Sequence, residues 1–313
     1  MGVIDVRARL TADDLPERVR LLGFREADVD DVLAAAAAVA GSPEEVARIE
    51  VWAADLVDHI GSFDPHGAED RWPGAAEDER RGMGVLPMLA LLVSADEVHA
   101  FHRSRGVPDD ISWRSLSDLG QQVWVHRRTY GAFGLHTQDW LCIGWSGALY
   151  WLGRLQFDLE QQGGRWVLST HIPQSGPLTP AAVDDAFRRA IAFFAEHFPE
   201  HPTSEFYCSS WLLDPELAAV LPAGSNMVRF QQRWDRYGEA MPADADALFF
   251  VFARRGDVDL DQLPRETTLQ RGIIDRLRSG RHWSMCEGRI PHERIQQSPV
   301  PPTGFAAAGA PSA

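Results

Sequence analysis

Apolar side chains recur every three or four positions through the first third of the chain, which is the period of a helix with one buried face. An alanine-rich segment ends at Gly41, and Ser42-Pro43 then provides the cap and first-turn residues of another helix. The helical period continues over residues 86–101 and 110–128. We therefore predict a helical N-terminal domain over residues 1–130, with a polar, glycine-rich surface loop at 61–84.

The apolar period changes from that of a helix to that of a strand after Gly134. Residues 149–160 alternate between apolar and polar side chains, which predicts one half-buried strand. Residues 140–145 and 166–172 are predicted as the strands on either side of it, with turns at Ser146-Gly147 and Gly163-Gly164. Three consecutive strands joined by short turns make an antiparallel meander.

The remaining part of the chain mixes helices with strands. Thr179-Pro180 is a strong helix start, because a hydroxyl cap precedes a proline in the first turn. We predict strands at 206–213, 227–234 and 248–253, a short helix after Asp214-Pro215 and a helix over 263–278. The prediction is an α+β fold, with a second domain over residues 131–292 built on a mixed, mostly antiparallel sheet flanked by helices. Residues 293–313 are predicted to be a disordered tail.

Charge and composition exclude several classes of function. The formal net charge is -15, which argues against a nucleic-acid or membrane partner, because both need a basic surface. The sequence contains no lysine, and all 30 of its basic residues are arginine. Enzymes that need a Schiff-base lysine and P-loops that need a phosphate-binding lysine are therefore excluded.

The three cysteines, Cys142, Cys208 and Cys286, lie far apart and form no metal-spaced cluster, so we expect no metal. A few unpaired cysteines suit a reducing compartment. The N-terminal residues carry no apolar leader segment, and the longest apolar run, at 85–93, is too short to span a bilayer. We expect a cytoplasmic protein.

Five segments of the sequence together resemble a known family. They are LGRLQFDLE (152–160), HIPQSGPLT (171–179), FYCSSWLLDP (206–215), SNMVRFQ (225–231) and LPRETTLQRGI (263–273). The chain is similar to bacterial acyltransferase-domain proteins, in which a helical N-acyltransferase N-terminal domain precedes a GNAT-like C-terminal domain. This resemblance implies acyl transfer from an acyl-CoA thioester, bound where two neighbouring strands splay apart.

The resemblance implies a phosphate site in the loop between the third strand and the following helix. Ordinary GNAT enzymes hold the CoA pyrophosphate there on a glycine-rich loop, and a helix N-terminus favours anions. This chain has one glycine in the loop, and Pro177 and Pro180 remove two amide donors. An acyl carrier protein is therefore an alternative donor, and an ordinary capped turn is the simpler interpretation. The candidate cofactor-binding residues are Ile172, Gln174, Ser175, Gly176, Leu178 and Thr179, together with Asn226 beside the pantetheine arm.

Three residues on the two adjacent strands are candidates for catalysis. His171 ends its strand just before the loop, and a neutral imidazole can take the proton of an amine nucleophile. Cys208 could accept the acyl group if its pKa were lowered, although a lone strand cysteine is more often a small buried hydrophobe. Ser210 could donate a proton to the leaving thiolate or position the substrate. For His171 the simpler interpretation is a structural histidine within the sheet.

The polar face of the long strand supplies candidates for substrate binding. Arg154 could hold a carboxylate with its planar guanidinium group, and Gln156 lies beside it. Asp158 and Glu160 are candidate general bases on the same face. The simpler interpretation of this face is a solvated sheet surface. Trp211 is a candidate wall of the acyl pocket.

These observations support two hypotheses of different classes. The first is an enzyme that moves an acyl group from acyl-CoA, or from an acyl carrier protein, to a small amine in specialised metabolism. An acidic carrier protein would need an arginine patch, for which Arg127 with Arg128 or Arg254 with Arg255 are candidates. The second is a non-catalytic sensor that binds acyl-CoA or another metabolite. A His171 that faces an open cleft favours the enzyme, and a His171 bonded away from the cleft favours the sensor.

Overall fold

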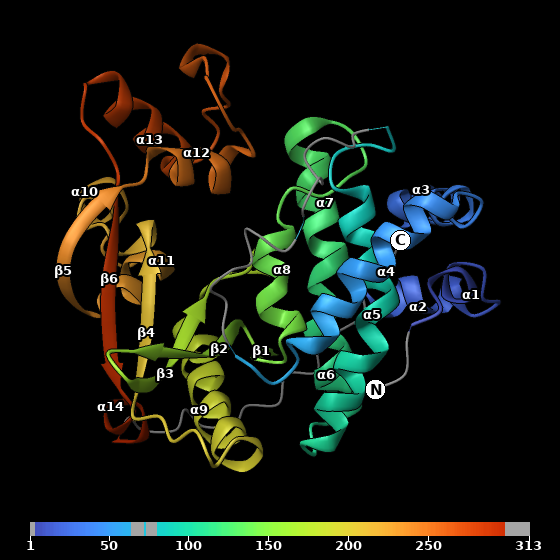
Figure 1. Ribbon diagram of the computed structural model, residues 1–313. Coiled ribbons are helices and arrows are strands. Elements are labelled where there is room, and N and C mark those ends of the chain that lie inside the picture. The colour runs from blue at the N-terminus through green and yellow to red at the C-terminus, as the bar shows by residue number, and fades with distance from the viewer. Residues whose placement is uncertain (1–3, 64–71, 73–79, 298–313) are drawn as a thin grey trace, which may run out of the picture.

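The computed structural model describes residues 4–63, 72 and 80–297, and its N-terminal part is a bundle of helices (Figure 1). The helices are α1 (Val6–Leu10), α2 (Leu15–Leu21), α3 (Glu26–Ala40), α4 (Pro43–Asp58), α5 (Val85–Ser104), α6 (Asp109–Leu116), α7 (Asp118–Tyr130) and α8 (Gln138–Trp145). The cap between α3 and α4 is the predicted one: the Ser42 hydroxyl accepts a hydrogen bond from the Glu45 amide at 3.4 Å. The predicted helical N-terminal region is confirmed.

Helix α5 forms the centre of this bundle. By length and composition alone it could cross a membrane, with a mean hydropathy of 1.2, and it is the one such helix among the residues that the structure describes. In the fold, however, 72% of that segment is buried, mostly against the surrounding helices. The first half of α5, residues 85–95, is almost wholly apolar because every face of it is covered.

The predicted helix over 110–128 is two helices in the structure, α6 and α7, which meet at Ser117. The Ser117 hydroxyl donates to the Arg114 carbonyl at 2.6 Å and ends the first helix. Gly120, in the first turn of α7, packs so close to Gly23 that a Cβ atom on it would lie 2.1 Å from a Gly23 backbone carbon. Asp118, two residues before Gly120, is buried.

The C-terminal part of the chain is built on a six-stranded sheet with the order β1-β2-β3-β4-β6-β5. The strands are β1 (Leu149–Leu152), β2 (Leu155–Gln162), β3 (Arg165–His171), β4 (Glu205–Ser210), β5 (Asp235–Pro242) and β6 (Ser284–Pro291). The pair β3–β4 is parallel and the other pairs are antiparallel. The predicted α+β fold with a mixed, mostly antiparallel sheet is confirmed.

Helices cover both faces of the first half of this sheet (Figure 1). On one face lies α9 (Pro180–His197), which begins at the predicted cap, Thr179. Its Phe187 packs against Phe157 of β2 and Phe206 of β4 in a second hydrophobic core. The N-terminal helices α6, α7 and α8 lie over the other face.

Two strand predictions in the meander differ from the structure. Residues 140–145 belong to helix α8, and the predicted long strand 149–160 is broken into β1 and β2 by a turn at Gly153-Arg154. Gly153 has φ = 70°, a conformation that glycine adopts without strain. The face that carries Gln156 and Asp158 was predicted to be exposed or to line a cleft, and both residues are 97% buried because the N-terminal helices cover it.

The last two predicted strands are helices. Residues 227–234 mostly form α11 (Asn226–Gln231), and residues 248–253 mostly form α12 (Asp244–Phe252). The short helix α10 (Leu217–Val220) and the helix α13 (Thr268–Arg278) agree with prediction. The true last strands, β5 and β6, carry little apolar alternation, and β5 is an almost wholly exposed edge strand.

Two further predictions fall partly outside the described residues. Most of the predicted loop at 61–84 lies there, as do residues 298–313 of the predicted tail. The first residues of that tail differ from prediction: residues 293–297 belong to helix α14 (His292–Gln297), in which Ile295 is 97% buried.

Candidate active site

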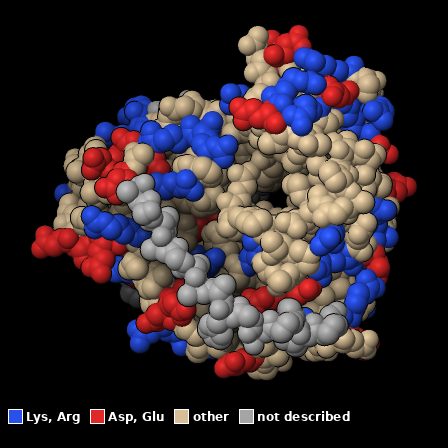
Figure 2. Space-filling model, turned by 180° about the vertical axis from the view of Figure 1, so that it is seen from behind, with Lys and Arg blue, Asp and Glu red and all other residues tan. Residues whose placement is uncertain are grey.

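A cavity of about 960 Å³ lies between the N-terminal helices and the sheet domain. Its walls come from α7 and α8 on one side and from β2, β3, β4, α11, α12 and α13 on the other. Seen from behind, the molecule is hollowed near its centre, and mostly uncharged residues surround the opening (Figure 2). The volume is at the upper end of the range for small-molecule sites.

The parallel strands β3 and β4 separate beside this cavity. They pair only at Leu168–Phe206 and Ser169–Tyr207, although both strands continue beyond those residues. Past that point His171 of β3 and Ser210 of β4 line the cavity. The splayed strands therefore leave a gap that opens into the cavity.

A histidine and an aspartate are hydrogen-bonded to each other at this gap. His171 and Asp158 lie on the same face of neighbouring strands, and Nε2 of His171 is bonded to Oδ1 of Asp158. A carboxylate only accepts hydrogen bonds, so Nε2 carries a hydrogen, and in the neutral imidazole Nδ1 is then the nitrogen with the lone pair. The Asp158 side chain is 4% exposed, whereas that of His171 is 26% exposed and lines the cavity.

A second buried carboxylate, Asp118, lies near His171. Its oxygens accept hydrogen bonds from the Trp140 indole nitrogen at 2.8 Å and from the Gln122 amide at 3.2 Å. The Trp140 ring meets the His171 ring at 4.6 Å between centroids, with an angle of 73° between the planes. Burial raises the pKa of Asp118 above its ordinary value, while Trp140, Gln122 and Gln156 act to lower it.

The loop from Pro173 to Leu178 joins this gap to the N-terminus of α9. Arg154 holds the loop through the carbonyls of Pro173 (2.8 Å) and Gly176 (3.0 Å) and through the Ser175 hydroxyl (3.3 Å). Gln174 accepts a hydrogen bond from Arg128 of α7 and donates one to the Phe250 carbonyl of α12. The loop thus links both sides of the cavity.

Family models match the two parts of the chain in turn. Residues 13–147 match an N-acyltransferase N-terminal domain, and residues 149–290 match a GNAT-like C-terminal domain. An acyltransferase solved with decanoyl-CoA and teicoplanin and one solved with CoA and 10C-teicoplanin are each 34% identical to this chain, with a TM-score of 0.82 over 90% of this chain and 88% of the other. The chain belongs to this acyltransferase family.

A further solved acyltransferase, in complex with decanoyl-CoA, is 32% identical and has a TM-score of 0.78 over 89% of this chain and 88% of its own. A comparison with curated proteins finds no match. The resemblance stated from the sequence is confirmed, and the expected donor agrees with these acyltransferase structures, which hold acyl-CoA or CoA.

The structure places most of the predicted donor-site residues around the cavity of this acyltransferase. Ile172, Gln174, Gly176, Leu178 and Asn226 line it. Ser175 instead accepts the hydrogen bond from Arg154, and the Thr179 hydroxyl accepts from the Ala182 amide as the cap of α9. Asn226 comes from the first turn of helix α11 and not from a strand.

The other predicted residues have different surroundings. Ser210 and Trp211 line the cavity, and the Ser210 hydroxyl accepts from the Leu212 amide at 3.1 Å. Cys208 lies in the core, 99% buried, and burial raises the pKa of its thiol well above the ordinary value. The structure therefore gives Cys208 the surroundings of a packing residue rather than of a nucleophile.

Two residues that were predicted to contact the substrate instead have their polar groups bonded or buried within the protein. Arg154 lies in the β1–β2 turn instead of on a strand face, and its guanidinium nitrogens are bonded to the loop. Burial lowers the pKa of Arg154 from its ordinary value. Gln156 lines the cavity wall but is 97% buried. With these surroundings, Arg154 and Gln156 are better suited to holding the site in shape than to binding the carboxylate of a substrate.

Asp118 and Trp140 are site residues that sequence reasoning did not single out. The sequence predicts a strand over residues 140–145, which includes Trp140, and one helix over residues 110–128, which includes Asp118. The order Ser117-Asp118, a cap residue followed by an acidic residue, is the local signal that could have placed Asp118 in a first helical turn. Their contact with His171 spans 31 residues or more of sequence, so no local pattern predicts it.

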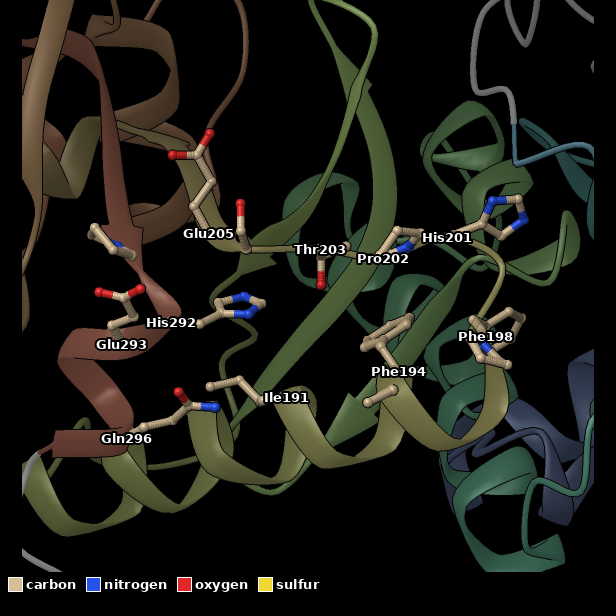
Figure 3. A pocket seen from close by; sticks show the side chains of 14 residues that line it. Ile191, Phe194, Phe198, His201, Pro202, Thr203, Glu205, His292, Glu293 and Gln296 are labelled. Atoms are coloured by element: carbon tan, nitrogen blue, oxygen red, sulfur yellow. The ribbon is translucent and has the colours of Figure 1, made fainter.

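A second cavity, of about 650 Å³, lies between α9, the start of β4 and α14 (Figure 3). It carries Glu205, Glu293, His201 and His292, and none of the predicted site residues. Among the described residues, no group of three or more His, Cys, Asp or Glu side chains could hold a metal ion there or elsewhere. The first cavity, where β3 and β4 separate and most of the predicted site residues gather, is the candidate active site.

Removing the Arg154 guanidinium should weaken donor binding more than chemistry. Arg154→Ala frees the carbonyls of Pro173 and Gly176, so the loop at the N-terminus of α9 loses its fixed shape. We expect the KM for acyl-CoA to rise roughly tenfold, with kcat within about threefold of the original. Steady-state kinetics at varied acyl-CoA test this, with Arg114→Ala as a control that removes one arginine–carbonyl bond, to Gly153, in the same turn. A rise in KM that is equal in both variants would contradict this role.

Proposed function

We propose that this acyltransferase moves an acyl group from acyl-CoA to an amine, with His171 as the general base. The observation that carries the proposal is the His171–Asp158 pair, which stands where β3 and β4 separate and opens into the cavity. Catalysis, rather than sensing, is favoured because His171 lines the cavity and is 26% exposed, with one ring nitrogen held by Asp158.

The donor is expected in the gap between the splayed strands. Released from pairing with each other, β3 and β4 offer backbone groups to a pantetheine arm, and the loop at the N-terminus of α9 lies where anionic phosphates are favoured. Arg154 fixes this loop through its carbonyls. We expect the thioester carbon beside His171 and Ser210, which both line the cavity.

The proton movements follow from the tautomer of His171. Nδ1, which carries the lone pair, accepts the proton of the attacking amine, while Asp158 holds Nε2–H and stabilises the imidazolium that forms. The amine nitrogen bonds to the thioester carbon, the tetrahedral intermediate collapses and the carbon–sulfur bond breaks. The proton passes from His171 to the CoA thiolate, so the products are an amide and free CoA.

The acceptor is proposed to be an amine on a bulky molecule of the glycopeptide kind. A cavity of about 960 Å³, ringed mostly by uncharged residues, has room for more than an acyl chain. Support also comes from the related acyltransferases solved with teicoplanin. We propose a cytoplasmic enzyme of specialised metabolism.

An acyl carrier protein is the less favoured donor. Of the arginines considered for carrier docking, Arg127 is paired with Asp28 and Asp31. Arg128 bonds Gln174, and Arg255 stacks over Phe249 at 3.8 Å. Such contacts leave these side chains less free to bind an acidic partner.

The proposal is tested by incubating the purified protein with octanoyl-CoA or decanoyl-CoA and following release of the CoA thiol. We expect rapid release only when a glycopeptide bearing a free amine is added. The same glycopeptide with its amine acetylated is the control and should give no release above background. Equal release with both acceptors, or none with either, would contradict transfer to an amine.

A further inference from the structure

Asp118 is an unusual residue to find on the wall of this cavity. Its carboxylate is 98% buried, and a buried charge is costly unless it is paired or well hydrogen-bonded. The groups that face it are Gln122 of its own helix, Trp140 of α8, Gln156 of β2 and His171 of β3. The two side chains that donate hydrogen bonds to it, Trp140 and Gln122, are both neutral.

Trp140 connects this carboxylate with the base. Its indole nitrogen donates to Asp118 Oδ2 at 2.8 Å, and its ring meets that of His171 at 4.6 Å. Held by the hydrogen bond, the indole contacts the imidazole ring from α8, and Asp158 holds Nε2 from β2. The position of Nδ1 is thereby set by contacts from two domains.

We propose that Asp118 and Trp140 are a positioning pair through which the N-terminal domain aims His171 Nδ1 at the reacting amine. This inference rests on the proposed role of His171 as the base. If the pair acts in this way, the N-terminal helices position the catalytic base in addition to covering one face of the sheet. Neither residue needs to exchange a proton, because each acts through the geometry of the imidazole.

Three variants separate the parts of this pair. Trp140→Phe keeps a ring against His171 but removes the indole hydrogen. Asp118→Ala removes the acceptor, while Asp118→Asn keeps one oxygen that can still accept from Trp140. Trp145→Phe is the matched control: Trp145 also lies on α8 and also donates a buried indole hydrogen bond, to the Leu91 carbonyl, but it does not line the cavity.

We expect Trp140→Phe and Asp118→Ala each to lower kcat roughly ten- to hundredfold, with the KM for acyl-CoA within about twofold. The double variant should be no slower than the slower single variant, because both changes break one interaction. Asp118→Asn should recover at least about fivefold over Asp118→Ala, and Trp145→Phe should keep the original kcat.

Several results would overturn the inference. They are kcat values for Trp140→Phe within about twofold of the original, additive losses in the double variant, or an equal loss in Trp145→Phe. If Asp118→Ala fails to fold, Asp118→Asn and Trp140→Phe still decide the matter. Should His171→Ala itself keep the original rate, the proposed base fails instead, which distinguishes the two claims.

Discussion

His171→Ala should lower the rate of acyl transfer by about 10²–10⁴-fold and leave acyl-CoA binding intact. The side chain lines the cavity where β3 and β4 separate. In the proposed mechanism its Nδ1 carries the lone pair that accepts the proton of the attacking amine. Its removal leaves the amine to lose its proton to water. Single-turnover rates with saturating acyl-CoA measure the loss, and calorimetry measures the donor affinity.

A matched control for this experiment is His201→Ala. His201 is also partly buried, and it packs against the rings of Phe63 and Trp166, but it lies at the second cavity, away from the splayed strands. We expect its rate to stay within about twofold of the original. A His171→Ala protein that binds acyl-CoA and still transfers at the original rate would contradict the assignment of the base.

Asp158→Asn should lower kcat by about 10²–10³-fold with little change in the amount of folded protein. An asparagine can donate to Nε2, which favours the tautomer with the hydrogen on Nδ1, and that nitrogen can no longer accept a proton from the amine. The substitution also removes the negative charge of Asp158, which stabilises the imidazolium. Steady-state kinetics test this, with circular dichroism as the check on folding.

Glu160→Gln is the matched control for Asp158→Asn. Glu160 lies on the same face of β2 two residues further along, and its carboxylate accepts from Gln162 rather than from His171. The control makes the same carboxylate-to-amide change without touching the base, so kcat should change by less than about twofold. Equal losses in both variants would show a general effect of charge on this strand.

The sequence predicts one part of the site well, because that part depends on local periodicity. Strand alternation puts Asp158 on one face of β2 and His171 on one face of β3, and the structure brings these faces together. The loop after His171 and its cap at Thr179 follow from residue type alone. These are contacts between adjacent strands or within one turn.

Other parts of the site depend on packing between distant segments. Gln156 and Asp158 are buried only because the N-terminal helices cover that face of β2, which the alternation of β2 cannot reveal. The contact of Trp140 with His171 arises in the same way. Arg154 leaves the strand because Gly153 turns the chain, and its guanidinium then reaches back to the loop.

Short apolar runs account for the errors in the later strands. The runs inside α11 and α12 are too short for helical and strand periods to be separated. In α11 the Ser225 side chain accepts from the Val228 amide and begins a helix. Strand β5 was missed because almost all of its residues are exposed and it shows no apolar alternation.

The central claim is that an amine takes the acyl group directly from acyl-CoA at His171. The most direct test is the mass of the acceptor and of the protein after a single turnover with decanoyl-CoA, before and after treatment with hydroxylamine. The account predicts one acyl group on the acceptor, held by an amide bond that survives hydroxylamine, and no acyl group on the protein. Acylated protein, or an acceptor whose acyl group is released by hydroxylamine, would contradict it.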